Sequence, residues 1–178
     1  MTRPLRLVLA FLAFGALGQE ARAACTDAAM PGVQWRRCML DGSDLTGADL
    51  SGADLRDSSF KRSDFTGAKL AEIQARRAKF VSSTLANADF TGADLVQADL
   101  TSADLSGAKL IGASLRAARL FQANLRGADL SQAVLDGADL LRADFSGARW
   151  TDGRTLCAEG SIGRCHPSSG APGAKVEG

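Results

Sequence analysis

The hydrophobic and polar positions of this chain repeat every five residues. An apolar residue, here called the centre of its pentad, occupies every position divisible by five from Leu40 to Trp150. These twenty-three centres are Leu, Phe or Trp, with Ala75 as the one exception. Two residues before each centre lies a small residue, with Ile73 as the one exception, and the other positions are mainly polar or Gly. The frame does not slip, so the pattern predicts one continuous repeat structure.

A period of five matches neither the 3.6 residues of an α-helix turn nor the two-residue alternation of a flat strand. It favours a chain that turns a corner in every pentad, with the centre and the small residue facing inward. Gly42, Gly92 and Gly107 lie at positions where glycine would ease such a corner. The pattern therefore predicts an all-β solenoid with a Leu-rich and Ala-rich interior.

The pentads between about Val33 and Trp150 resemble the pentapeptide-repeat family, whose unit is commonly written A(D/N)Lxx. The resemblance implies a right-handed quadrilateral β-helix in which four pentads make one coil and short bridges stack between coils. The repeat contains twenty-four pentads, counting the one centred on Trp35, and therefore corresponds to about six coils. Neighbouring coils are expected to be separated by about 4.8 Å.

The charges support a coil of twenty residues. One column of positions twenty residues apart alternates in sign without a break, and a second column does the same over four positions. Opposite charges on neighbouring coils attract and like charges repel, so this order fixes the register more than it adds stability. A step of fifteen residues gives no such order. The first column is Asp49, Lys69, Asp89, Lys109, Asp129 and Arg149; the second is Lys79, Asp99, Arg119 and Asp139.

The N-terminus has the form of a signal peptide. Arg3 and Arg6 precede a short apolar run, and Ala21-Arg22-Ala23 is a small-x-small cleavage site. The run is too short to cross a bilayer, so we expect cleavage rather than a membrane anchor, and no transmembrane span in the mature chain. The prediction is an exported protein, periplasmic or extracellular. The predicted segments are a signal peptide (1–23), an N-terminal cap (24–37), the repeat (38–150), a C-terminal cap (151–165) and a disordered tail (166–178).

The four cysteines flank the regular repeat: Cys25 and Cys38 before it, Cys157 and Cys165 after it. Three pairings are possible. If the repeats hold the two ends several coils apart, only Cys25 with Cys38 and Cys157 with Cys165 can reach bridging distance. We therefore expect disulfide-capped ends; free thiols are the alternative. A zinc site is less favoured because the chain has no C-x-x-C motif and one histidine, His166.

Composition and the absence of known motifs restrict the classes of function that this chain can have. Signal cleavage leaves 18 basic and 19 acidic residues, and this near-neutral balance argues against bulk nucleic-acid binding. No enzyme motif is present, so we expect no catalytic residues, no cofactor and no metal. Calcium binding by Asp44 and Asp64, one coil apart, is disfavoured because calcium needs six or more oxygen ligands.

Two outer surfaces are candidates for interaction. Arg36, Arg56, Arg76 and Arg116 lie in one column, interrupted by Val96, and this basic stripe could hold an acidic partner, a polyanionic glycan or a lipid headgroup. A solvated face that keeps the rod soluble is the favoured alternative. Arg76 and Arg77 also follow the irregular pentad at Ile73 and Ala75, which either exchanges volume inside one coil or presents a modified face.

The second surface is apolar. Phe121 and Leu141 are both predicted to point outward, one coil apart, and could form a homodimer contact.

The leading hypothesis is a non-enzymatic structural or interaction scaffold outside the cytoplasm, with a protein or envelope component as its unknown partner. The alternative, implied by the family resemblance, is a DNA-mimicking topoisomerase-binding inhibitor. That alternative needs an acidic face and a cytoplasmic location, and the signal sequence and the arginine stripe both argue against it.

Overall fold

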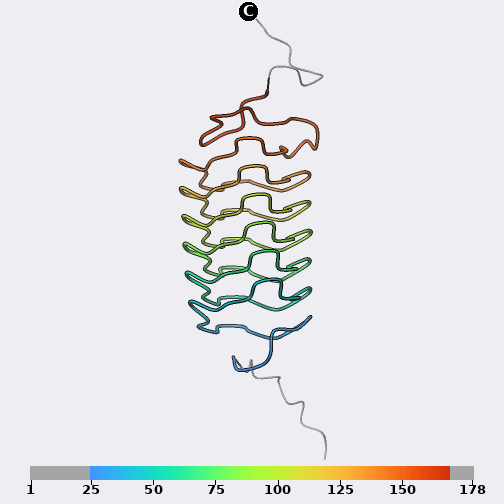
Figure 1. The fold of residues 1–178 in the computed structure, drawn as a ribbon, viewed down its shortest axis with the longest axis vertical. Coiled ribbons are helices and arrows are strands. Elements are labelled where there is room, and N and C mark those ends of the chain that lie inside the picture. The colour runs from blue at the N-terminus through green and yellow to red at the C-terminus, as the bar shows by residue number, and fades with distance from the viewer. Residues whose placement is uncertain (1–24, 169–178) are drawn as a thin grey trace, which may run out of the picture.

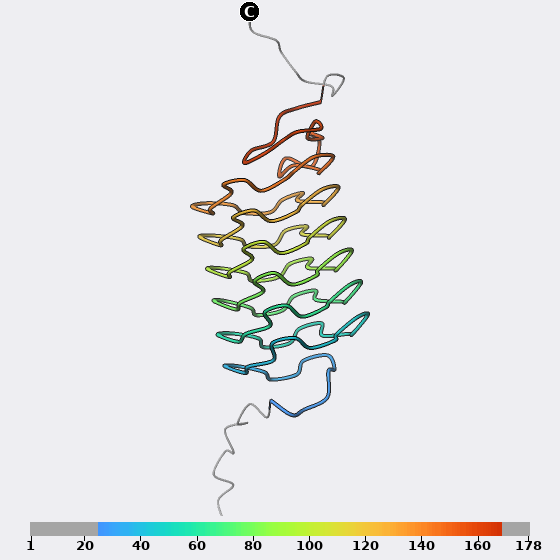
Figure 2. The same ribbon diagram turned by 60° about the vertical axis from the view of Figure 1, so that its left-hand side comes forward.

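Residues 25–168 of the computed structural model form one solenoid, which rises coil by coil from the N-terminal to the C-terminal end (Figures 1 and 2). These are the residues that the structure describes. The predicted signal peptide and the predicted tail beyond Ser168 lie outside them. Within 25–168 there is no helix, and hence no helix that could cross a membrane. The strands are single-residue β-bridges, one in each pentad.

Every parallel bridge joins a residue to the one twenty positions later. The coil length that the charge columns indicate is therefore confirmed. The bridges form four columns, one for each side of the solenoid, and each column contains six residues. The columns run from Gln34 to Val134, from Met39 to Asp139, from Asp44 to Asp144 and from Asp49 to Arg149.

A tight turn after each centre makes the corner. The carbonyl of Leu45 accepts a hydrogen bond from the N–H of Ala48 at 3.0 Å, and this three-residue step recurs at many corners. The second residue after the centre has a positive φ, as the third residue of a type II turn requires. Gly67 meets this need without strain, but thirteen non-glycine residues, Arg77 (φ 56) and Ala117 (φ 53) among them, also adopt it. The corners are therefore the strained part of the coil.

The interior is filled by the centres and the small residues. Every centre from Leu50 to Leu130 is fully buried. The aromatic centres gather toward the N-terminal half, where the rings of Phe60 and Phe80 stack with centroids 5.4 Å apart. Inward serines pair with the backbone of the coil before: Ser83 Oγ donates to the carbonyl oxygen of Phe60 at 2.6 Å. The core is thus continuous from coil to coil.

The irregular pentad exchanges volume inside this core. Ile73 and Ala75 are both completely buried. Their neighbours in the same two columns follow the regular pattern, with Ala93 beside Ile73 and Leu95 beside Ala75. The larger inward residue therefore lies in the coil where the centre is small, which is the compensation that keeps core volume roughly constant.

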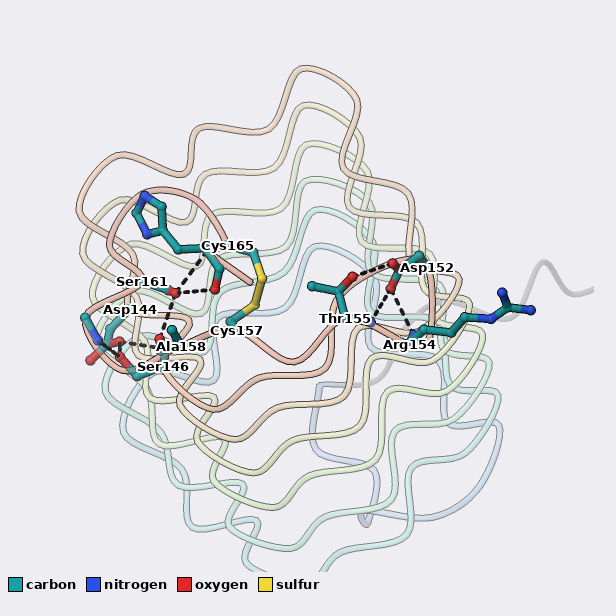
Figure 3. The surroundings of a disulfide bond; sticks show 11 residues. Asp144, Ser146, Asp152, Arg154, Thr155, Cys157, Ala158, Ser161 and Cys165 are labelled. Atoms are coloured by element: carbon teal, nitrogen blue, oxygen red, sulfur yellow. Dashed lines mark hydrogen bonds between the residues drawn. A yellow bond between two sulfur atoms is a disulfide. The ribbon is translucent and has the colours of Figure 1, made fainter. Parts of the chain in front are cut away.

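Each end of the solenoid carries a disulfide. Cys25 is bonded to Cys38, with Cα atoms 5.4 Å apart, and Cys157 is bonded to Cys165, with Cα atoms 5.0 Å apart (Figure 3). At the N-terminal end Trp35 packs against Phe60 with ring centroids 6.3 Å apart. Both bonds close short loops against the core, where Cys38 and Cys157 are buried.

The C-terminal cap is antiparallel to the coil that it covers. Ile162 bridges Asp144, and Leu156 bridges Arg149. The cap extends beyond the predicted limit at Cys165: Pro167 bridges Cys157, and the N–H of Ser168 donates to the carbonyl oxygen of Leu156 at 2.9 Å. His166 to Ser168 were predicted to belong to the tail because Pro and Ser are common in loops; backbone hydrogen bonds hold them to the cap instead.

Leu105 and Ser106 test the inward and outward assignments. Leu105 is completely buried, and the neighbouring Ser106 lies on the outer surface. Leu105→Lys buries an unpaired charge and should lower the free energy of unfolding by about 3 kcal/mol or more. Ser106→Lys should change it by less than about 0.5 kcal/mol. Thermal and urea unfolding of both variants gives the comparison, and equal effects would show that the inward face is wrongly assigned.

The irregular pentad permits a double-mutant cycle. Ile73→Ala alone leaves a cavity and should cost about 2–5 kcal/mol, and Ala75→Leu alone overpacks the coil and should cost about 1–3 kcal/mol. The double variant restores the regular pentad, so it should be more stable than the sum of the single changes by at least about 1 kcal/mol. Urea unfolding measures all four proteins. Additive costs would mean that the two residues do not compensate each other.

Candidate functional site

The aspartates that precede the centres stabilise the corners. Asp64 Oδ1 accepts hydrogen bonds from the N–H of Thr66 at 2.8 Å and from its hydroxyl at 2.6 Å. The carboxylate therefore closes an Asx turn at the residue where the chain leaves the flat side. The same paired contact recurs at Asp49 with Ser51, Asp89 with Thr91, Asp129 with Ser131, and Asp144 with Ser146.

These contacts favour the ionised carboxylates. The hydroxyl of Thr66 and then its N–H lower the pKa of Asp64, and Thr46 acts in the same way on the pKa of Asp44. Asp44 and Asp64 bridge each other, and the charge of Asp44 slightly opposes the lowering at Asp64. Over residues 25–168 no three His, Cys, Asp or Glu side chains come together as a metal site. Asp44 and Asp64 thus have a structural role at the corners.

Ion pairs link neighbouring coils along the alternating columns. Lys69 Nζ lies 3.2 Å from Asp49 Oδ2, and Arg119 Nη1 lies 3.7 Å from Asp99 Oδ2. Both pairs are largely exposed, so each contributes little to stability. Their consequence for function is that these sides present balanced charge to solvent.

The predicted arginine stripe carries its own counter-ions. Arg36 and Arg56 share Asp54, whose side chain is only 4% exposed. Arg76 pairs with Asp94, and Arg116 Nε lies 3.5 Å from Asp136 Oδ2. An acidic partner would therefore have to displace or share carboxylates that already neutralise the guanidinium groups.

Arg77 is also held within the structure. Its Nε and Nη2 donate to the two carboxylate oxygens of Asp57, one coil away, at 2.6 and 3.0 Å. This two-pronged contact raises the pKa of Arg77 through its hydrogen bond with Asp57. The arginines after the irregular pentad are thus part of the ion-pair network, and the pentad differs from the others in its core packing.

The apolar candidates Phe121 and Leu141 lie in one column at the C-terminal end. The N–H of Gln122 donates to the carbonyl oxygen of Leu141 at 3.0 Å, so the two coils are directly paired there. Phe121 is half-buried, whereas Leu141 is 62% exposed. Phe121 helps to line an open hollow of about 380 Å³ on this side. The other lining residues are Val81, Asp99, Thr101, Arg119 and Asp139.

Sequence reasoning did not find this hollow. The sequence indicates the hollow only through the size of three outward residues in one column: Thr101 is smaller than its neighbours Val81 and Phe121. The ion-paired state of the arginines was also missed, because Arg76 and Asp94 are eighteen residues apart and belong to different columns.

Asp152 organises the loop at the start of the C-terminal cap. One carboxylate oxygen accepts the N–H groups of Arg154 at 2.9 Å and Thr155 at 2.8 Å, and the other accepts the Thr155 hydroxyl at 2.5 Å (Figure 3). The hydroxyl of Thr155, with these two N–H groups, lowers the pKa of Asp152 from 3.8 to about 2.

The sequence profile of pentapeptide repeats matches this chain with eight copies, over residues 21–57, 58–95, 78–116 and 113–149. No curated protein sequence matches it significantly.

Solved structures that match this chain include two pentapeptide repeat proteins, Rfr23 and HetL, and the protein QnrB1. Rfr23, from the cyanobacterium Cyanothece 51142, is 23% identical with a TM-score of 0.53; the match covers 66% of this chain and 90% of that one. HetL, which is involved in heterocyst differentiation regulation in Nostoc sp. strain PCC 7120, is 30% identical with a TM-score of 0.43, over 68% and 61% of the two chains. Trypsin-treated QnrB1, a plasmid-mediated fluoroquinolone resistance protein, is 21% identical with a TM-score of 0.44, over 70% and 73%. The likeness to Rfr23 bears on the fold alone.

The lowered pKa of Asp152 predicts acid sensitivity of the cap. Because the folded-state pKa lies below the ordinary value of 3.8, the carboxylate contributes stability that is present above about pH 4 and is lost as the pH falls through about 2. Asp152→Asn removes this titration. The melting temperature of the wild type should exceed that of the variant at pH 7, and the difference should shrink between pH 4 and pH 2.

Thr155→Val serves as the companion variant for this prediction. It removes the hydroxyl donor and should raise the folded-state pKa of Asp152 toward 3.8, so the carboxylate should contribute less stability at pH 7 and the loss should be complete at a higher pH than in the wild type. Melting curves by circular dichroism over a pH series measure both variants. A difference between the wild type and Asp152→Asn that stays constant down to pH 2 would contradict the assignment.

Proposed function

The chain belongs to the pentapeptide repeat family, and from this premise we propose that it acts outside the cytoplasm as a non-enzymatic scaffold that binds another protein or an envelope component. Proteins of this family are generally non-enzymatic scaffolds. The single observation that carries the location is the disulfide at each end of the solenoid, because such bonds persist mainly in oxidising compartments. The predicted signal peptide supports the same location.

The side-chain contacts support a binding role over catalysis. The carboxylates close turns or pair with arginines, as Asp64 and Asp57 do, and so are not poised as acid and base. The interior is packed by Leu, Phe and Ala, so a partner would contact the outer surface. Flat sides with balanced charge and two ends of different structure are what such a rod can offer to a partner.

The topoisomerase-binding alternative requires an extended acidic face that imitates DNA. The ion pairs disfavour it, because the carboxylates of Asp54 and Asp94 are matched by arginines and two of the four columns alternate in sign. Cytoplasmic retention of the chain is the result that would restore this alternative.

The location can be tested with a reporter fused after Gly32, in the predicted N-terminal cap. An alkaline phosphatase reporter, which folds actively only in an oxidising compartment, should be active, and the precursor should be shortened by cleavage before Ala24. A second fusion that begins after the signal segment should be inactive. Activity confined to a cytoplasmic reporter would refute export.

The binding role can be tested by capture of envelope proteins on the immobilised mature chain. Arg76→Gln and Arg116→Gln remove two exposed members of the stripe, while Arg56 is kept because it neutralises the buried Asp54. Lys61→Gln and Arg62→Gln, on another side, are the matched controls. If the stripe contacts the partner, the first pair should reduce capture severalfold and the controls should not. No saturable, specific capture by the wild type would refute the scaffold role.

A further inference from the structure

Over residues 25–168 the C-terminal cap pairs with two of the four sides of the last coil, and Gly163 of the cap also lies close to the corner at Leu140 and Arg142. The antiparallel bridges of the cap reach the columns that end at Asp144 and Arg149. Among residues 25–168 no segment pairs above the other two sides, which are formed by residues 133–142 and are here called the open edge. Figure 2 shows the cap, in red, over one part of the last coil.

The open edge carries a full set of unpaired backbone groups. Within the described part of the chain, four of its N–H groups donate no hydrogen bond and two of its carbonyls accept none, although the equivalent groups one coil below are all paired. In that coil, for example, Leu120 donates to Asp139 and Ala118 accepts from Asp139. The N–H groups belong to Leu135, Gly137, Leu140 and Arg142, and the carbonyls to Ala133 and Ala138.

The cap shows what kind of segment satisfies this pattern. On the adjacent side Phe145 donates to Ser161 and Gly147 donates to Cys157, while the carbonyl of Ala143 accepts from Gly163. These groups have the same spacing as those of Leu140, Arg142 and Ala138, five residues earlier. An extended, antiparallel segment therefore fits the open edge in the way that the cap fits its neighbour.

Side chains at the open edge specify an apolar and basic occupant. Leu141 is 62% exposed, and Leu135 and Leu140 are only half-buried, whereas Leu115 and Leu120, one coil below the latter two, are fully buried. Asp139 is exposed and, over residues 25–168, has no cation within 4 Å. An apolar side chain beside Leu141 and a Lys or Arg beside Asp139 would complement this surface.

A second copy of the chain fits less well. An antiparallel pairing of two open edges about their midpoint places Asp136 of one copy opposite Asp139 of the other, and like charges directly opposite each other are destabilising. On these grounds we infer that the open edge binds an extended segment of another protein, of mixed basic and apolar sequence, by β-strand addition. The inference rests on the proposed scaffold function and names the place and chemistry of its binding site.

The test uses the purified mature chain and a short fluorescent peptide that contains the pattern Val-x-Lys, which in an antiparallel pairing places the valine beside Leu141 and the lysine beside Asp139. Fluorescence anisotropy should show saturable binding, and hydrogen exchange by NMR should slow at Leu135, Gly137, Leu140 and Arg142. A peptide methylated on alternate backbone nitrogens should bind at least about tenfold more weakly, because it cannot complete the ladder. A peptide with glutamate in place of lysine should also bind more weakly.

Matched variants separate the edge from the side. Asp139→Lys should weaken binding about fivefold or more, whereas Asp99→Lys, in the same column two coils below, should leave it within about twofold. Leu141→Asp should weaken binding, and Thr101→Asp, its counterpart two coils below, should not. Circular dichroism melting confirms that each variant is folded.

Four results would overturn the inference: equal binding of the methylated peptide, equal effects of Asp139→Lys and Asp99→Lys, unchanged exchange at the four N–H groups, or slow exchange there without peptide. The last result, if it depends on protein concentration and is lost with Phe121→Asp and Leu141→Asp, assigns the edge to a homodimer; if it is independent of concentration, the edge is covered within the chain. Capture of an envelope partner that is unchanged by Asp139→Lys would leave the scaffold function standing and remove only the edge.

Discussion

The backbone ladder with a step of twenty residues is the interaction on which the rest of this structure depends. Each pentad contributes one bridging residue, and that residue pairs with the coil below and the coil above. A single bridge is too short to be stable alone, so each side is held by six residues in a column and by a core that continues between coils. Each coil therefore needs its neighbours.

This dependence explains where strain and charge are placed. A chain that must turn after every bridge needs a positive φ in each pentad, and Ala117 and Arg77 accept that conformation although glycine would suit it better. The cost is offset by the ladder and by carboxylates such as Asp64, which bind the N–H groups at the corner. The acidic residues of the repeat are thus a requirement of the turn, and basic residues in adjacent columns and coils neutralise them.

The period made the fold readable from sequence. The inward positions, the coil length and the alternation of Asp49 and Lys69 all follow from a step of five or twenty, and the structure has each of them. Contacts between columns do not follow from a period. The ion pair of Arg76 with Asp94 and the hollow beside Phe121 depend on the way in which long side chains cross a corner. The position of His166 to Ser168 depends on the geometry of the cap, which lies outside the repeat. The predictable part of the chain was therefore the scaffold, and the unpredictable part was its surface and ends.

The same periodicity concentrates the unmatched groups at one place. In the middle of the solenoid the next coil pairs every bridging residue and buries every centre, and along two of the columns it supplies residues of opposite charge, so the sides offer a partner few unpaired backbone groups. At the C-terminal end of the described residues, 25–168, the repeat is followed by a cap that is shorter than one full coil and bridges two of the four columns. Within the described residues, this cap leaves N–H and carbonyl groups between Ala133 and Arg142 without backbone partners, as they are at the edge strand of a sheet. The proposed binding at this end depends on the partial cap, because a cap that paired with all four sides would leave no backbone groups for an added strand.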